Sequence, residues 1–241
     1  MNETLESEKI EYKLVRSNRK TVSIQLLEDG DVKVSAPFSV TKTQIDEIIK
    51  GKLSWILKKQ EELKRIYKEK NVDRKFEDGE KICYLGEEYS LKIIKTKEVS
   101  QSKVVIDNDN MVIYINEKFI DKDDKENIRN IIKKWLVERF RDVAADRIKK
   151  YSFLIGVNPT KITIREQKTR WGSCSSKGSI NLNWKLVMAP MKVVEYVIVH
   201  ELCHMIEMNH SKDYWNIVSS IMPHYKNHRK WLKENGHKLG I

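Results

Sequence analysis

Apolar and polar residues alternate in the first part of the chain with the period of two that is typical of half-buried strands. The alternation runs through residues 9–36 and is interrupted at Asp29-Gly30-Asp31, a sequence that favours a hairpin turn. Pro37 closes the hairpin, and Thr41-x-x-Gln44 is a capping box that starts a helix. Apolar residues follow helical spacing after this box, so we expect one helix over about residues 41–70.

A second group of strands ends near residue 118, where the hydrophobic pattern changes. Val104–Ile106 and Met111–Ile115 flank a polar turn and predict another hairpin. Helical spacing then predicts a long amphipathic helix over residues 122–154. We therefore place a domain boundary here, between a β-rich N-terminal region, residues 1–118, and a second region, residues 119–241.

The last part of the chain combines a hairpin with a strongly apolar helix. Lys177-Gly178 divides two short apolar runs, which predicts a hairpin at about residues 171–184. Pro190 is a suitable first-turn residue, and the run Val193–Val199 predicts a buried helix. The expected fold class is α+β, with one helix in the β-rich N-terminal half. The C-terminal half would hold the long helix, the hairpin and this buried helix.

The buried helix carries the sequence His200-Glu201-Leu202-Cys203-His204. Positions i and i+4 lie on one helix face, so His200 and His204 can direct two imidazoles at a single ion. Glu201 lies about 100° further round the helix, where a base could take a proton from metal-bound water. The H-E-x-x-H pattern is the signature of zinc metallopeptidases. We therefore expect a zinc ion on the two histidines and a general base at Glu201.

A catalytic zinc keeps three protein ligands and one open position, so a third ligand is needed. His210 can reach the ion only if the chain turns back after about Met208, and Asn209 tolerates the left-handed conformation of such a turn. This spacing is that of the metzincins, except that Glu207 replaces their turn glycine. Glu207 is a rival ligand because it shares a helix face with His200. We prefer His210, because three ligands in a straight row fit a tetrahedral ion badly.

The predicted hairpin before this helix supplies candidate substrate contacts. A strand edge can pair with an extended peptide, and Gly172 would let another backbone approach closely. We therefore expect Trp171, Gly172 and Ser173 to bind substrate, although core packing is the simpler role for Trp171. Arg170 would bind a carboxylate, a phosphate or the developing oxyanion, unless it forms a structural salt bridge.

Two residues near the C-terminus are further candidates. Met222 would form a hydrophobic floor beneath the metal, and Tyr225 would offer its phenol to the transition state. Ordinary core packing for Met222 and ring stacking for Tyr225 are the alternatives.

Composition bears on partners and on cellular location. The net charge is +11, with 34% charged residues, which favours acidic partners such as nucleic acid or nucleotides, although lysine-rich surfaces are common. The three cysteines predict no disulfide framework, and therefore a reducing cytosol. Residues 1–6 lack the apolar core of a signal peptide, and no apolar run approaches the roughly 18 residues of a membrane span. We expect a cytoplasmic protein without a membrane partner.

Several of these motifs together resemble the YgjP-like metallopeptidases, relatives of the SprT and WLM zinc proteases. The resemblance implies a zincin-type catalytic half, with His200, His204 and His210 on zinc and Glu201 as general base. It spans nearly the whole chain and rests on these segments: Arg19–Ile24, Ala36-Pro37, Lys52–Ile56, Arg170–Cys174, Ile180–Trp184, His200–His204, Asn209–Ser211 and Trp215.

We therefore predict a zinc-dependent metallopeptidase-type hydrolase that acts on a peptide or protein. In this mechanism, Glu201 activates zinc-bound water, which attacks the peptide bond. The resemblance leaves two alternatives open: a metal-dependent nucleotide (UTP) pyrophosphohydrolase and a protease that acts on DNA-associated proteins. A nucleic-acid-binding module with a structural zinc is disfavoured, because structural zinc usually has four protein ligands.

Overall fold

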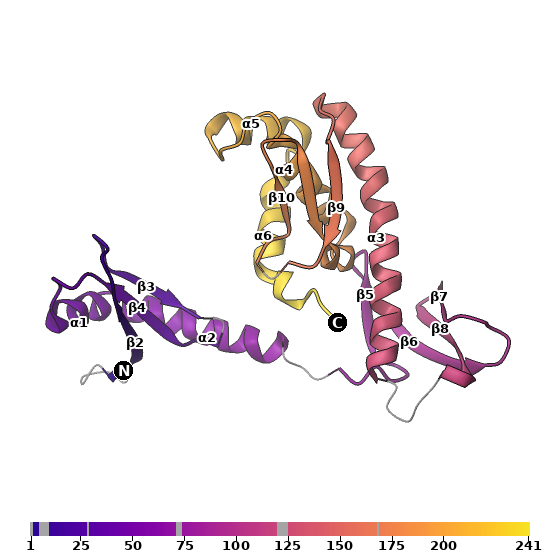
Figure 1. Ribbon diagram of the computed structural model, residues 1–241, viewed down its shortest axis with the longest axis horizontal. Coiled ribbons are helices and arrows are strands. Elements are labelled where there is room, and N and C mark those ends of the chain that lie inside the picture. Colours follow the sequence, from indigo (N-terminus) through magenta and orange to yellow (C-terminus); the bar gives the residue numbers. More distant parts are fainter. Residues whose placement is uncertain (1, 5–9, 28, 71–73, 120–124, 168) are drawn as a thin grey trace. The chain divides into compact units, whose positions relative to one another are not determined.

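The computed structural model describes residues 2–4, 10–27, 29–70, 74–119, 125–167 and 169–241 (Figure 1). The chain forms two compact units, Met1–Asp73 and Arg74–Ile241. Each unit has its own hydrophobic core. The described residues form six α-helices and three sheets, which is the mixed α+β class that the sequence predicts.

The first unit is a sheet of four strands accompanied by two helices. The strands are β1 (Asn2–Thr4), β2 (Glu11–Arg16), β3 (Ser23–Leu26) and β4 (Val32–Ala36), in the order β1-β2-β4-β3. β2 and β4 are parallel, and the other neighbours are antiparallel. Gly30, with a φ of 91°, lies in the predicted turn between β3 and β4. The strands expected within residues 9–36 are therefore confirmed.

The single helix expected over residues 41–70 is in fact two helices. These are α1 (Lys42–Lys50) and α2 (Leu53–Lys70). The predicted capping box forms at the start of α1, between Thr41 and Gln44. The break follows Gly51, where the N–H of Lys52 donates to the carbonyl of Ile49, three residues back rather than four. Glycine is a poor helix former, so ending α1 at this position loses little helix-stabilising free energy.

The second unit contains two sheets and the remaining helices. Its strands are β5 (Lys81–Tyr84), β6 (Glu87–Thr96), β7 (Lys103–Asp107), β8 (Asn110–Asn116), β9 (Lys161–Arg165), β10 (Gly172–Cys174) and β11 (Ser179–Asn183). They form sheets of order β5-β6-β8-β7 and β10-β11-β9. Its helices are α3 (Lys125–Ile155), the 3-10 helix η2 (Trp184–Met188), α4 (Met191–Cys203), α5 (Lys212–Ile221) and α6 (Tyr225–Asn235).

Most elements predicted for this unit are confirmed. β7 and β8 form the first predicted hairpin, and β10 and β11 form the second. α3 corresponds to the long helix expected over residues 122–154, of which residues 122–124 lie outside the described part. None of the helices in the described ranges is long and apolar enough to span a lipid bilayer.

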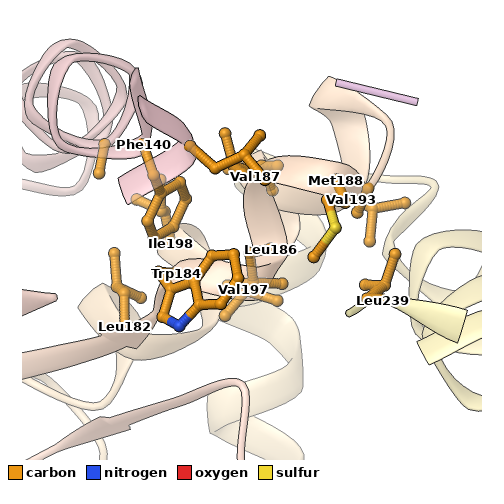
Figure 2. Close-up of a cluster of buried hydrophobic side chains, with 14 of the residues drawn as sticks. Phe140, Leu182, Trp184, Leu186, Val187, Met188, Val193, Val197, Ile198 and Leu239 are labelled. Atoms are coloured by element: carbon orange, nitrogen blue, oxygen red, sulfur yellow. The ribbon is translucent and has the colours of Figure 1, made fainter. Parts of the chain in front are cut away.

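The core of the second unit packs around α4. Figure 2 shows Phe140 of α3 and Leu182 of β11 gathered with Val197 and Ile198 of α4 and with side chains of η2. The same core contains Ile113 of β8, so it extends across the boundary that the sequence suggests near residue 118. That position therefore lies inside the second unit, because strands and helices on both sides of it share one core.

Two polar features fix α4 in this core. Glu195 of α4 is 2% exposed, and its carboxylate lies 3.0 Å from Lys192 Nζ and 3.6 Å from Arg147 Nε of α3. A buried carboxylate is tolerated only with such partners. The second feature is a backbone hydrogen bond. The N–H of Leu85 donates to the carbonyl of Val187 over 2.7 Å, so the β5–β6 turn lies against the segment that leads into α4.

Gly86 makes this second contact possible. It has a φ of 90°, and a methyl group added there would come within 2.8 Å of Pro190 Cα. Pro190 is the residue that caps α4. The turn between β5 and β6 is therefore packed directly against the N-terminal end of α4.

Glu166 supplies a test of the packing between α3 and η2. Its carboxylate bridges Lys133 of α3 at 2.7 Å and Lys185 of η2 at 3.2 Å. Hydrogen bonding to Lys133 is the largest cause that lowers the pKa of Glu166 from 4.5 to about 2. A carboxyl whose pKa is lower in the folded state stabilises the protein above its unfolded pKa, and this contribution is lost as the pH falls through the folded pKa.

We therefore expect Glu166→Gln to be less stable than wild type at pH 7, and the difference to disappear between pH 4.5 and about 2. Urea unfolding, followed by tryptophan fluorescence at a series of pH values, measures this difference. A stability difference that stays constant down to pH 2 would contradict the assignment.

Candidate metal centre and active-site cleft

The chain reverses direction directly after α4. The helix ends at Cys203, His204 follows as its C-cap, and the N–H of Met205 donates to the carbonyl of Leu202 over 3.0 Å. The helix expected to continue to about Met208 therefore stops earlier. Tight three-residue hydrogen bonds commonly end a helix in this way.

Asn209 does not supply the left-handed turn that the sequence suggested. It is not among the described residues with positive φ. Instead its backbone N–H donates to Glu207 Oε1 over 3.2 Å. The reversal after Cys203 removes the need for a left-handed residue, because it begins early enough to bring His210 back to α4.

His200, His204 and His210 converge on one point. A nitrogen from each ring lies within 4.8 Å of the other two, and the Nε2 atoms of His200 and His210 are 3.2 Å apart. Burial is the main cause that lowers the pKa of His200 to about 3, and it lowers that of His210 as well. Both rings are therefore neutral at pH 7, which is the form that binds metal ions.

This set of donors fits a divalent metal ion. Among the described residues, no carboxylate or thiol joins the three histidines. Three imidazoles without a fourth protein ligand are typical of a catalytic centre, which keeps one position open. Glu207, the rival ligand, faces away: its carboxylate accepts from Asn209, and its backbone carbonyl contacts His204.

Hydrogen bonds determine which ring nitrogen His200 and His204 direct at the shared point. Tyr214 Oη of α5 lies 2.6 Å from His200 Nδ1 and donates to the carbonyl of His200 over 3.0 Å. Because its proton goes to the carbonyl, the phenol accepts from Nδ1–H and leaves Nε2 of His200 for the ion. His204 Nδ1 donates to the carbonyl of Glu207 over 3.1 Å, with the same result.

Sequence reasoning missed Tyr214. Its spacing of four from His210, on a helix next to the candidate ligands, was the available signal. The side chain is fully buried in the core of the second unit.

Glu201 lies on α4 beside His200 and is 4% exposed. Burial raises the pKa of Glu201 to about 8, and the charge of Arg170 opposes this increase. Gly172 of β10 packs against it, and a methyl group added there would come within 2.5 Å of Glu201 Oε1. A side chain at position 172 would therefore displace the Glu201 carboxylate.

A cleft of about 540 Å³ opens over this centre. Arg170, Trp171 and Gly172 line it together with His200, Glu201 and His210, as the sequence predicts for residues that share one site. The lining residues that sequence reasoning did not single out are Tyr196, Val197, Trp215, Arg229, Leu232 and Lys233.

Three other candidates lie elsewhere. The hydroxyl of Ser173 accepts from Asn181 Nδ2 over 3.2 Å, within the β10–β11 hairpin, and Ser173 does not line the cleft. Tyr225 is 8% exposed and stacks on Trp215 with ring centres 5.0 Å apart. Met222 is buried in the core. Tyr225 thus takes the stacking role rather than a position in the cleft.

Trp215 connects this stack to the metal centre. Its ring lies parallel to the imidazole of His210, at 5.6 Å and an angle of 20°. The guanidinium of Arg229 lies 5.0 Å from the centre of the same ring. Stacking therefore supports His210, which is itself exposed and lies outside any helix.

Removing the Tyr214 hydroxyl tests its role at His200. We expect Tyr214→Phe to bind metal about 10- to 100-fold more weakly, because Nδ1 of His200 loses its partner while the ring still fills the core. Competition with a chelator of known affinity measures this change. Tyr196→Phe removes a phenol hydroxyl near the same histidine and should keep wild-type metal affinity. Equal affinities in wild type and Tyr214→Phe would exclude an orienting role.

The chain is similar to known metallopeptidases over different shares of its length. No curated protein matches the chain. The solved structures that are similar over part of it include two metallopeptidase zymogens. The metallopeptidase zymogen of Pyrococcus abyssi abylysin is 23% identical, with a TM-score of 0.35 over 37% of this chain and 93% of its own. The metallopeptidase zymogen of Methanocaldococcus jannaschii jannalysin is 19% identical, with a TM-score of 0.35 over 38% of this chain and 88% of its own.

A family model covers far more of the sequence. The model described as YgjP-like, metallopeptidase domain, matches residues 20–235. This range includes every residue of the metal centre and every residue that lines the cleft. The chain therefore belongs to the YgjP-like metallopeptidase family.

Proposed function

We propose that this metallopeptidase is zinc-dependent, with His200, His204 and His210 as the metal ligands and Glu201 as the general base. The observation that carries the proposal is the convergence of three imidazole nitrogens beside a buried carboxylate, at a cleft that His200, Glu201 and His210 line. Three nitrogen ligands suit zinc, which prefers tetrahedral coordination with an open position in catalytic sites. When bound, zinc would supply Lewis acidity that lowers the pKa of a coordinated water to about 7.

Glu201 would move the proton in this reaction. Its raised pKa, about 8, reflects burial, and a dication nearby would favour the charged carboxylate. The carboxylate accepts a proton from the attacking water and returns it to the nitrogen that leaves. Gly172 holds the carboxylate in place from the β10 side.

The peptide substrate would bind along β10. This strand is at the edge of its sheet and lies next to α4. An extended peptide can add to such an edge through backbone hydrogen bonds, so β10 would hold the scissile bond near Glu201. Arg170 lines the same cleft and is available to stabilise the oxyanion. Trp171 would border the bound peptide.

A nucleotide pyrophosphohydrolase is the weaker alternative. Phosphoryl transfer usually employs Mg²⁺ on carboxylates, and within the described ranges the group that could hold a metal consists of histidines alone. The described residues that line the cleft do not favour DNA-associated proteins over other protein substrates. The three cysteines are free, which supports a reducing location such as the cytoplasm.

The general-base assignment is tested by comparing wild type with Glu201→Gln and His210→Ala. We expect Glu201→Gln to keep about one zinc per chain and to hydrolyse peptides about 10²- to 10⁴-fold more slowly. His210→Ala should lose zinc, because two ligands remain. Metal analysis and cleavage of quenched fluorescent peptides measure both effects. Full activity in Glu201→Gln would refute the assignment, and unchanged zinc in His210→Ala would refute the ligand set.

Gly172→Ala tests the contact between β10 and the base. The added methyl group would overlap Glu201 Oε1, so the carboxylate must move. We expect kcat to fall about 100-fold while zinc content stays unchanged, because a small misplacement of a catalytic group is costly. Gly240→Ala is the matched control, since a methyl group there meets open space. Similar kcat values in the two variants would show that position 172 tolerates a side chain.

A further inference from the structure

The cleft contains more positive charge than the proposed mechanism uses. Arg170 lies in the segment before β10, whereas Arg229 and Lys233 lie on α6. Positions 229 and 233 are four apart, so the two side chains share a helix face. Glu201 is the single acidic residue among those that line the cleft, and it is buried.

None of these three cations forms an ion pair with an acidic residue among the residues that the structure describes. Lys230 of the same helix shows the contrast, because it pairs with Glu234 at 3.8 Å. Arg229 is held above Trp215 at 5.0 Å, a contact that orients the guanidinium without neutralising it. The cleft therefore presents fixed positive charge to whatever enters it.

The cations come from two different elements beside the metal centre. Arg170 and Arg229 line the same cleft as His200, Glu201 and His210, and the guanidinium of Arg229 lies over the Trp215 ring that stacks on His210. Between them, Val197, Leu232 and the ring of Trp215 provide apolar surface. A ligand with an aliphatic chain that ends in one negative group would match both the apolar surface and the positive charge of the cleft. A nucleoside triphosphate would instead bring several negative charges close to Glu201.

We propose that the cleft selects peptides with a carboxylate near the scissile bond, bound by Arg229 and Lys233. The carboxylate would belong either to an acidic side chain or to the free C-terminus of the peptide. Arginine binds a carboxylate through two parallel hydrogen bonds, which gives direction as well as affinity. This inference rests on the proposed peptidase function and names its substrate class.

Two pairs of quenched fluorescent peptides distinguish the two sources of the carboxylate. One pair differs by glutamate or glutamine beside the scissile bond, and the other ends in a free carboxylate or an amide. We expect wild type to cleave one acidic member with a kcat/KM about 10- to 100-fold above its neutral partner. The pair that shows the preference identifies the source. A ratio near one for both pairs overturns the inference.

Variants on α6 locate the preference. Lys233→Gln and the double variant Arg229→Gln/Lys233→Gln should reduce the ratio of kcat/KM values toward one. Lys233→Gln leaves the contact between Arg229 and Trp215 intact, so it remains informative if the double variant folds poorly. Lys230→Gln removes the same charge from the same helix outside the cleft and should keep the wild-type ratio. An equal fall in Lys230→Gln overturns the inference.

Binding to Glu201→Gln separates this inference from the proposed function. Tryptophan fluorescence would report the affinity of each peptide without turnover. If the variant binds the acidic peptide more tightly than its neutral partner and wild type cleaves neither, the inference is supported and the peptidase function is refuted. If wild type cleaves both peptides without preferring the acidic one, the peptidase function is supported and the inference is refuted. UTP is then added as a competitor of the acidic peptide. If UTP displaces the peptide at a concentration below the Kd of that peptide, the cations bind phosphate, and the inference is overturned.

Discussion

Burial of α4 is the constraint on which the rest of the second unit depends. The helix is buried along most of its length, yet it carries two carboxylates and a candidate metal-binding histidine. Charged groups in such a position need partners, and the two carboxylates differ in this respect. Glu195 is neutralised by Lys192 and Arg147, whereas Glu201 is left with a raised pKa beside the cleft. One helix thus carries two carboxylates with different surroundings. The ion pairs of Glu195 anchor the helix, whereas Glu201 is available for chemistry at the cleft.

The three histidines reach their arrangement by different means. His200 is fixed by a phenol from α5 and His204 by the backbone of the turn that follows α4, so both present Nε2. His210 has no comparable hydrogen bond in the described structure beyond its contact with His200, and it is supported by the face of Trp215. Rigid secondary structure therefore orients two of the candidate ligands, and an aromatic stack orients the third.

Local sequence predicted most of the elements and named the three histidines that the structure brings together. Strand alternation, the capping box at Thr41 and the spacing of His200 and His204 are properties of neighbouring residues. Tyr214, Arg229 and Lys233 were missed because only the packing of α5 and α6 against α4 brings them to the site. The early end of α4 was missed for a related reason: the chain reversal is stabilised by contacts that helical periodicity does not encode.

The contact between Gly86 and Pro190 has a consequence for the size of the catalytic unit. The turn between β5 and β6 covers the beginning of α4, while the candidate ligands lie at its end. A fragment trimmed to start at α3 would keep every cleft residue and still leave the first turn of the helix uncovered. The catalytic unit therefore includes the β5–β8 sheet, which supplies none of the described residues that line the cleft but completes the scaffold that carries them.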